Sequence, residues 1–551
     1  MSVADQNAVI NAPLVDMSVI AGAGSGKTKT SIGRVLSILN RLPSRKRVAL
    51  LSFSNVAVNT FQYGLTAVDC DTSRTTVATF DSFFTQHVVL PHSWRLMDCE
   101  GRPYLVLGDE PLLTNFAIYH QGRPQNISEL KIAFSDGSYR ASLGNSPVPW
   151  PVAQDAIIRL GRTGAYTYDI ARYWAHATLT LLPHLTQLLV HRYPYIMIDE
   201  AQDIGSMDWA IVQLLRQHGA RVCLVGDPAQ AIFGFNGGSG HYLRELGQTV
   251  GAAQFSLRTN FRSVPAIVHC ANRLTSRQDL ANRAALTTHS GAFILPYDPK
   301  APRGVVDRFT TVVQQLPYSS ADAAIICRAN NLVGQVRGGS SNRGAGLVKR
   351  LVKAAEFRVA NQYDRVFSEC VMVIAALLDP AIPRFASLVR DTPDGLAKLI
   401  RARIWRFICD HQGGLPSPEL IARDTWLPRL LGNMRALLQD LGVHGLIFAD
   451  IGRRLTARDL DATALIAANP TWRVDTVHQV KGESIGAVLY IATERHAQAL
   501  LGGIDTEDGR IGYVALTRAK DLFWLAVPDE SYRNLIHAAA AVGIMPLPAC
   551  I

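Results

Sequence analysis

Two short stretches carry residue types that could bind and hydrolyse a phosphoanhydride. The first, AGAGSGKT at residues 21–28, combines closely spaced glycines with a lysine and a threonine. Glycines let the chain turn sharply and let backbone N–H groups approach phosphate oxygens. Lys27 would supply a positive charge to the β and γ phosphates, and the hydroxyl of Thr28 suits Mg²⁺. The stretch therefore predicts a phosphate cradle, with a glycine turn of no function as the alternative.

A pair of adjacent acids could complete that chemistry. Asp199 and Glu200 follow an apolar run in YIMIDEAQD, residues 195–203. One carboxylate can orient toward the shell of a magnesium ion, and the next can take a proton from water. We therefore expect hydrolysis of a nucleotide and not binding alone. The alternative is a solvated acidic turn.

Strands of one sheet must position both stretches. The runs MSVIAG, RVALLSFS and TTVATF are each followed by a turn and a helical pattern, which is typical of a parallel α/β sheet. The pattern stops near Leu90 and resumes at residue 193, so we interpret the residues between as an insertion. A second region of this kind contains ADAAIICR, GAVLYIAT and DLFWLAVP, and it is interrupted by a mostly helical segment. Two interrupted α/β lobes suggest a cleft between them.

Composition sets broad limits on the partner and the compartment. The 551 residues exceed the roughly 250 to 300 that one core usually accommodates. A net charge of +10 favours a polyanionic partner without naming one. The eight cysteines show neither a CxxC pair nor zinc spacing, and no apolar run is long enough for a membrane span. We expect a cytoplasmic protein in a reducing compartment.

Eight stretches, in order along the chain, resemble the motifs of the UvrD/Rep-like branch of superfamily 1 helicases. The cradle and DEAQD match two of them. Any one match is weak, but eight in register are strong. The other six are LLSFSNVAVNTF (50–61), TFDSF (79–83), LVGDPAQAIFGFNGG (224–238), LRTNFRS (257–263), VDTVHQVKGES (474–484) and GRIGYVALTRAK (509–520).

The resemblance implies an α/β fold class with two RecA-like parallel-sheet P-loop lobes, each carrying a mostly helical inserted subdomain. We name the lobes 1A and 2A and their insertions 1B and 2B. The predicted boundaries are 1–89 and 185–265 for lobe 1A, 90–184 for insertion 1B, 266–345 and 465–551 for lobe 2A, and 346–464 for insertion 2B.

The resemblance also assigns roles around the nucleotide. Gln6 and Phe261 match residues that read and stack on adenine, Gln230 matches a sensor of the γ phosphate, and Arg262 and Arg518 match arginines that stabilise developing charge. The predicted catalytic residues are Lys27, Asp199, Glu200, Gln230, Arg262 and Arg518. Thr28 and Asp199 are the predicted metal ligands. The predicted ATP-binding residues are Gln6, Ala21, Gly22, Ala23, Gly24, Ser25, Gly26, Lys27, Thr28, Lys29, Phe261 and Glu483.

The resemblance implies that the protein moves along single-stranded DNA. Aromatic side chains suit this substrate because they stack on bases of any sequence. As an alternative, Phe53 and Phe80 could pack under the sheet. The residues matching positions that touch single strands are Phe53, Asn55, Thr79, Phe80, Phe235 and His478.

Three positions depart from the family pattern. Asn236 stands where an arginine usually follows the aromatic residue of its motif, and Asp81 stands where a histidine is common. Both changes remove potential positive contacts to the strand. The order KGES, where KGLE is commoner, leaves open whether Glu483 or Ser484 contacts the ribose.

The sequence therefore predicts an ATP- and Mg²⁺-dependent translocase on single-stranded DNA that unwinds duplexes in DNA repair, replication or defence. Travel in the 3′ to 5′ direction is implied by the resemblance alone. Arg518 belongs to the second lobe, so closing the cleft would complete the site and phosphate release would reopen it. One alternative is a DNA-dependent ATPase subunit that regulates or recruits a partner nuclease with little unwinding of its own. RNA in place of DNA is another.

Overall fold

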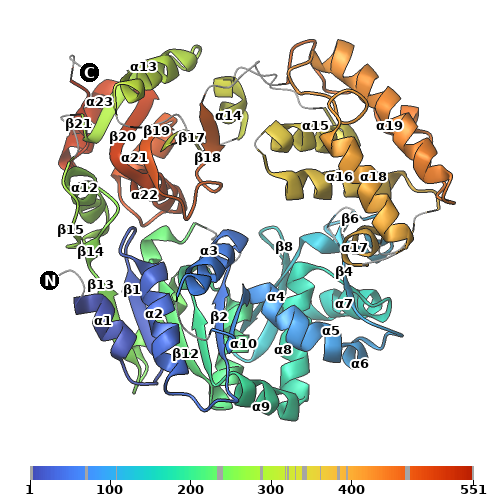
Figure 1. The fold of residues 1–551 in the computed structure, drawn as a ribbon, viewed down its shortest axis with the longest axis horizontal. Coiled ribbons are helices and arrows are strands. Elements are labelled where there is room, and N and C mark those ends of the chain that lie inside the picture. The colour runs from blue at the N-terminus through green and yellow to red at the C-terminus, as the bar shows by residue number, and fades with distance from the viewer. Residues whose placement is uncertain are drawn as a thin grey trace.

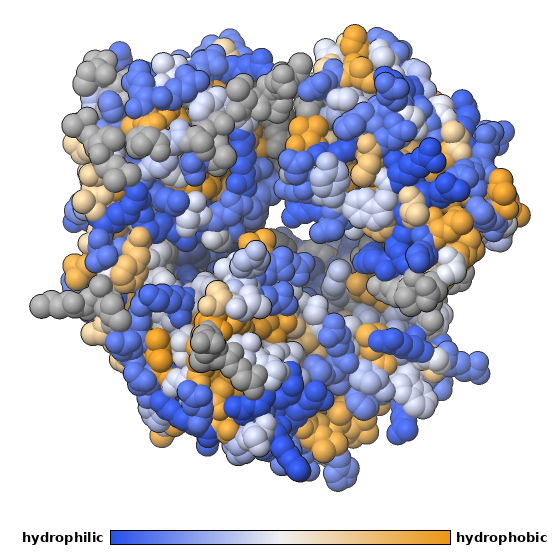
Figure 2. Space-filling model, viewed as in Figure 1, coloured by the Kyte–Doolittle hydropathy of each residue, from blue (hydrophilic) through white to orange (hydrophobic). Residues whose placement is uncertain are grey.

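The chain forms two lobes and two insertions around a hollowed centre (Figures 1 and 2). In the view of Figure 1, lobe 1A lies at lower left with lobe 2A above it, insertion 1B lies at lower right, and insertion 2B lies above insertion 1B. The computed structural model describes residues 4–68, 72–106, 108, 110–232, 240–285, 289–316, 318, 322–328, 330–337, 344–359, 361–380, 382, 385–392, 395–465 and 472–548.

Lobe 1A is built on a six-stranded sheet whose paired strands are all parallel. The carboxyl ends of parallel strands meet at one edge, so this edge gathers the cradle, the acid pair and the residues after β2 and β3. The strands, in sheet order, are β13 (Ala253–Leu257), β1 (Met17–Ala21), β12 (Arg221–Gly226), β11 (Tyr195–Ile198), β2 (Val48–Ser52) and β3 (Thr75–Thr79).

Helices connect these strands as the alternating sequence pattern predicts. They are α1 (Ala4–Asn11), α2 (Lys27–Leu39), α3 (Asn55–Thr66), α4 (Phe80–Phe84), α10 (Ser206–Gln217) and α11 (His241–Gln248), with single 3-10 turns at Ala201–Asp203 and Pro228–Gln230.

Lobe 2A repeats the design with a second six-stranded parallel sheet. A short parallel pair, β14 (Thr259–Asn260) and β15 (Leu280–Ala281), precedes it. The sheet order is β18 (Arg473–Thr476), β17 (Ala323–Cys327), β19 (Ile485–Ile491), β20 (Ala519–Pro528), β16 (Gly291–Tyr297) and β21 (Met545–Pro546). Its helices are α12 (Pro265–Thr275), α13 (Arg303–Gln314), α14 (Asn330–Arg337), α21 (Glu494–Leu501), α22 (Glu507–Arg518) and α23 (Asp529–Ala541).

Insertion 1B contains small sheets that the expectation of a mostly helical segment did not include. Its residues share one core with lobe 1A, so Trp174 and Leu51 belong to the same buried cluster. Its strands are β4 (Tyr104–Leu105), β5 (Ile118–His120), β6 (Arg123–Gln125), β7 (Leu130–Ser135), β8 (Ser138–Leu143), β9 (Ser146–Val148) and β10 (Ala165–Tyr166). A π turn at Thr85–Val89 leads from lobe 1A into the insertion. The helical segments of the insertion are α5 (Leu90–His92), α6 (Trp94–Met97), 3-10 turns at Pro111–Phe116 and Ile127–Glu129, α7 (Trp150–Arg162) and α8 (Tyr168–Leu181), and α9 (Pro183–Arg192) returns the chain to lobe 1A.

Insertion 2B is helical, as expected, and has a core of its own around residues such as Ile374 and Trp426. The helical segments of insertion 2B are α15 (Gly346–Val359), α16 (Tyr363–Leu377), α17 (Phe385–Asp391), α18 (Leu396–Cys409), a π turn at Ala422–Trp426, α19 (Leu427–Gly442) and α20 (Ile451–Arg454).

Among the described residues, no helix is both long and apolar enough to cross a membrane.

Candidate nucleotide site and nucleic-acid cavity

The loop between β1 and α2 has the backbone of a phosphate cradle. Gly24 and Gly26 have φ angles of +72° and +78°, a region that favours glycine. Ser25 braces the loop because its Oγ donates to the Gly22 carbonyl at 2.8 Å. Lys27 Nζ donates to the Ala21 carbonyl at 3.3 Å, which places the ammonium across the loop. Helix α2 begins here, so its unpaired N–H groups also favour an anion.

Residues from two distant segments pack against the cradle at very short range. Gln6 Nε2 donates to the Ser25 carbonyl at 3.1 Å, and the backbone N–H of Phe261 donates to the Gly24 carbonyl at 2.8 Å. A Cβ added at Gly24 would lie 2.5 Å from Cβ of Arg262. The glycines are therefore required for close packing as well as for the turn. Gln6, Phe261 and Arg262, which were predicted to act on the nucleotide, all lie against the cradle.

The acid pair lies at the end of β11, beside the cradle. Asp199 continues the sheet because its N–H donates to the Leu51 carbonyl at 2.8 Å. Burial and the neighbouring Glu200 carboxylate raise the pKa of Asp199. Glu200 has a φ of +53° and accepts a hydrogen bond from Gln202. Although burial opposes the shift, the charge of Lys27 lowers the pKa of Glu200, which favours its ionised form.

The oxygens at this point fit a magnesium ion. Asp199 Oδ1 is buried and has no hydrogen-bond partner among the described residues, and Thr28 lies in the first turn of α2. Mg²⁺ prefers oxygen ligands and usually keeps waters and substrate phosphates in its shell. The described residues contain no group of three or more His, Cys, Asp or Glu side chains that could hold a metal ion. A carboxylate, a hydroxyl and phosphate oxygens would therefore share the ion.

Arg518 of lobe 2A points into the site of lobe 1A. Its Nη2 donates to Gln230 Oε1 at 3.0 Å, and Gln230 Nε2 donates to Asp227 Oδ2 at 2.8 Å. The Arg518 side chain is buried, and its Nη1 donates to the Glu483 carbonyl at 3.2 Å. The predicted γ-phosphate sensor and the second-lobe arginine are thus in direct contact.

The two predicted arginines share a pocket that lacks sufficient negative charge. Arg262 Nη1 donates to the Thr517 carbonyl at 2.9 Å, whereas its Nε is buried without a hydrogen-bond partner among the described residues. Burial and the neighbouring Arg518 lower the pKa of Arg262 to about 9, and burial lowers the pKa of Arg518 as well. A polyphosphate entering here would relieve both penalties.

Sequence reasoning missed two contacts at this site. Arg277 Nη1 lies 3.3 Å from Asp227 Oδ1, and a Cβ added at Gly22 would lie 2.8 Å from Arg277 Nη2. Arg277 follows α12 in an irregular segment, where no spacing could have indicated it. Lys481 Nζ lies 2.6 Å from Asp203 Oδ2 and joins the lobes. Lys481 and Asp203 both lie in stretches that resemble helicase motifs, so their positions in those motifs could have indicated that they belong to the site.

Two residues of the predicted nucleotide set lie less directly at the cradle. Lys29 is exposed, whereas the preceding residues of the cradle are buried or half-buried. The Glu483 carboxylate forms two bonds to the Arg473 guanidinium, at 2.6 and 2.8 Å, and its backbone carbonyl accepts from Arg518. A ribose contact by Glu483 would compete with that ion pair, and the choice between Glu483 and Ser484 stays a prediction.

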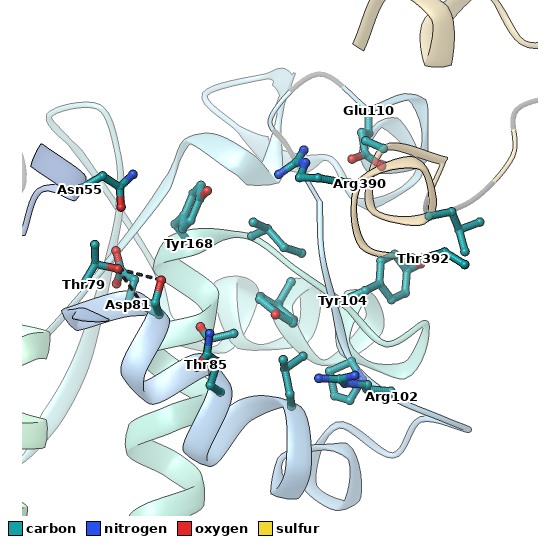
Figure 3. Close-up of a pocket in the computed structure, with 18 of the residues that line it drawn as sticks. Asn55, Thr79, Asp81, Thr85, Arg102, Tyr104, Glu110, Tyr168, Arg390 and Thr392 are labelled. Atoms are coloured by element: carbon teal, nitrogen blue, oxygen red, sulfur yellow. Dashed lines mark hydrogen bonds between the residues drawn. The ribbon is translucent and has the colours of Figure 1, made fainter. Parts of the chain in front are cut away.

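A cavity of about 900 Å³ lies where lobe 1A meets both insertions (Figure 3). In this view Asn55 and Thr79 lie on one side, Arg390 and Thr392 lie on the other, and Tyr168 lies between them. Tyr168 begins α8 of insertion 1B, and Arg390 comes from α17 of insertion 2B. The cavity thus combines rings, amides, hydroxyls and arginines, the groups that bind single strands.

The structure corrects one of the predicted nucleic-acid contacts. Phe80 is only 1% exposed and stacks on Phe53, with ring centroids 5.5 Å apart and planes 13° apart. Phe80 therefore cannot offer a face to a base, and the packing alternative is correct for it. Phe53 is half-buried and lines the cavity.

Of the remaining contacts predicted for the strand, the described residues include only His478, in lobe 2A. His478 is half-buried, and the backbone of Ile232 faces its ring. Phe235 and the departure at Asn236 lie outside the described residues. The strand contacts of His478 and Phe235 stay predictions.

Comparison with known proteins agrees with these observations. The family model described as the UvrD/REP helicase N-terminal domain matches residues 2–100 and 159–250. YjcD of Bacillus subtilis is 25% identical over 354 residues, which are 57% of this chain and 44% of that protein. DNA helicase II of Salmonella typhimurium is 27% identical over 289 residues, 49% of this chain and 39% of that protein. The ATP-dependent DNA helicase srs2 of Schizosaccharomyces pombe is 22% identical over 325 residues, with shares of 53% and 36%. The chain therefore spans less than half the length of these curated relatives.

Proposed function

We propose that this chain is an ATP-driven translocase on single-stranded DNA that unwinds duplex DNA, because its residues 2–100 and 159–250 match the family model of the UvrD/REP helicase N-terminal domain. One observation supports this most directly. Arg518 of lobe 2A donates to Gln230 of lobe 1A, beside a buried Arg262 Nε and a buried Asp199 Oδ1 without partners among the described residues. A nucleotide with its metal would satisfy both atoms and connect the lobes.

The catalytic steps follow from the positions of the side chains. Lys27 and the N–H groups of the cradle would hold the β and γ phosphates. Glu200, an ionised carboxylate, would accept a proton from the attacking water. Arg262 and Arg518 would stabilise the charge that develops on the γ phosphate. Mg²⁺ held by Thr28 and Asp199 would neutralise phosphate charge.

Movement requires that the nucleotide change the distance between the lobes. Arg518 contributes from lobe 2A, so ATP would favour a closed cleft and phosphate release would let it open. The cavity residues Phe53, Asn55 and Thr79 belong to lobe 1A, whereas His478 belongs to lobe 2A. Opening and closing would therefore change the spacing of contacts along a strand. Travel from 3′ to 5′ is proposed from the family resemblance.

A DNA-dependent ATPase subunit that recruits a partner such as a nuclease, with little unwinding of its own, is a second candidate. The carboxylates of Asp81 and Glu110 line the cavity together with the cations of Arg102 and Arg390. A cation at the position of Asp81 would attract a backbone phosphate, whereas the Asp81 carboxylate does not. This lining therefore favours a lower affinity for the strand.

ATP turnover measured with single-stranded DNA, with single-stranded RNA and without nucleic acid tests the proposal. We expect DNA to stimulate turnover most, and Lys27→Ala to abolish it. Strand displacement on 3′-tailed and 5′-tailed duplexes then tests direction. Stimulation without displacement would favour the second candidate. Turnover that is the same in all three conditions would exclude the translocase.

A further inference from the structure

A half-buried arginine outside all the motifs contacts carboxylates of three helices. Arg172 lies in the middle of α8, in insertion 1B. Its Nε and Nη2 donate to the two carboxylate oxygens of Asp81 at 2.8 and 3.0 Å. Its Nε also lies 3.1 Å from Asp208 Oδ1, and its Nη1 lies 3.7 Å from Asp169 Oδ1. One guanidinium therefore holds carboxylates from α4, α10 and α8.

The contact with Asp81 reaches the cavity. Asp81 lies in the first turn of α4, where the Thr79 hydroxyl accepts from the backbone N–H of Ser82 at 3.1 Å. The next residue after Thr79 is Phe80, which stacks on Phe53. Because Asp81, Thr79 and Phe53 all line the cavity, a strand that shifts this turn also shifts the carboxylate held by Arg172.

The contact with Asp208 reaches the acid pair. Asp208 Oδ2 accepts from the backbone N–H of Gly205 at 3.0 Å and so caps α10 at its first turn. The 3-10 turn Ala201–Asp203 comes just before this cap and directly after Glu200. Asp203 in that turn binds Lys481 of lobe 2A. A displacement of the cap therefore has a short covalent path to both the acid pair and the contact between lobes.

The geometry of the guanidinium makes this connection stiff. The planar guanidinium binds the Asp81 carboxylate with two bonds, which an ammonium cannot do. Its contact with Asp208 Oδ1 is electrostatic, because that oxygen has no hydrogen-bond partner among the described residues. Against the effect of burial, the carboxylates of Asp208, Asp81 and Asp169 raise the pKa of Arg172. The Arg172 guanidinium therefore keeps its charge, which attracts the carboxylates of all three segments, although burial raises the pKa of Asp208.

We propose that Arg172 is a positioning residue that transmits occupancy of the cavity by a strand to the acid pair, and so sets how strongly DNA stimulates ATP turnover. The inference rests on the proposed function, because it needs a nucleic acid in the cavity and a nucleotide in the cleft. Arg172 is not among the residues that line the cavity. It acts through Asp81 on one side and through Asp208 on the other.

Arg172→Lys tests the proposal in the full chain, because it keeps the charge in the cluster and removes the two-bond geometry. Asp208→Asn is the second variant: the amide oxygen can still cap α10, while the charged contact is lost. Arg159→Lys is the matched control, since Arg159 forms an exposed ion pair with Asp155 on the neighbouring α7. The readouts are turnover without nucleic acid, maximal turnover with a polythymidine strand, and the Kd of that strand with and without a non-hydrolysable ATP analogue.

We expect both variants to keep turnover without DNA within about twofold of the wild type, and to lose at least about fivefold of the stimulation by DNA. We also expect the effect of the ATP analogue on the strand Kd to shrink, because the same cluster would couple the binding of the two ligands. Adding Asp81→Asn to Arg172→Lys should cause no further loss of the stimulation by DNA, because each change alone already breaks the contact between Arg172 and Asp81.

The contrary results are distinct. Undiminished stimulation in Arg172→Lys and Asp208→Asn would overturn the inference, and so would an equal fall in turnover with and without DNA, which indicates a general structural role. A wild-type chain that DNA does not stimulate would instead overturn the proposed function, and this inference with it.

Discussion

The nucleotide site and the cavity between lobe 1A and the insertions are organised in different ways. At the nucleotide site, buried side chains are held by directed bonds, such as those from Arg518 to Gln230 at 3.0 Å and from Gln230 to Asp227 at 2.8 Å. The cavity of about 900 Å³ is wide, and its Phe53 is half-buried while Asn55 is exposed. Stabilising a reacting phosphate needs donors in fixed places, whereas stacking on bases needs only available surfaces.

The two regions also differ in which parts of the chain build them. Lobes 1A and 2A together supply the nucleotide site, where Arg518 of lobe 2A contacts Gln230 of lobe 1A. The cavity takes one wall from lobe 1A and the others from the insertions, through residues such as Tyr168 and Arg390. A single substitution should therefore be severe at the nucleotide site, and graded in and around the cavity.

The largest effect is expected at the acid pair. Glu200→Gln removes the carboxylate that would accept the proton from water, so we expect kcat for ATP to fall roughly 100-fold or more while ATP still binds. Steady-state turnover and binding of a fluorescent ATP analogue measure the two quantities. Glu530→Gln, at an exposed position of α23, is the control. Near-normal kcat in Glu200→Gln would place the base elsewhere.

A smaller effect is expected in the cavity. Phe53→Ala removes one stacking surface, which should weaken binding of single-stranded DNA roughly tenfold. Fluorescence anisotropy with a labelled oligonucleotide at fixed salt measures the change. Tyr63→Ala is a matched control, because Tyr63 is 84% exposed on α3 and does not line the cavity. If both variants bound DNA equally well, the strand would take another path.

The smallest effect is expected beneath the wall of the cavity, at His176. Tyr168, Arg172 and His176 are spaced four residues apart and so share one face of α8. Tyr168 lines the cavity, Arg172 contacts the three carboxylates, and His176 lies in the core. The Tyr139 hydroxyl lies 2.7 Å from His176 Nδ1, and burial lowers the pKa of His176 to about 4.

This lowered pKa makes folding sensitive to acid. Between the ordinary pKa of His176 and about 4, the unfolded chain binds a proton that the folded chain does not, so stability falls as pH falls. From pH 7 to pH 5 the loss should be about 2 kcal/mol, and His176→Gln should remove that part of it. Urea unfolding at the two pH values measures this, with the exposed His191→Gln as control. An unchanged pH dependence in His176→Gln would contradict the assignment.

Much of the nucleotide site could be predicted because its signals are local. The glycine spacing before Lys27 and the apolar run before Asp199 each lie within a few residues, and parallel strands bring such segments to one edge. The partners from farther away, such as Arg518, came from the order of the motifs and the family that they resemble. Phe80 was mistaken because a motif position does not reveal whether its ring faces outward or packs on Phe53.

By itself, the sequence determined the alternation of strands and helices, the cradle and the acid pair, because each depends on backbone preferences and on residues close in the chain. Only the tertiary structure decided the strands in insertion 1B, the place of Arg277 beside Gly22, and the hold of Arg172 on Asp81. The last pair is 91 positions apart. Such contacts carry no periodic signal, since their free energy comes from burying charges that only the folded chain brings together.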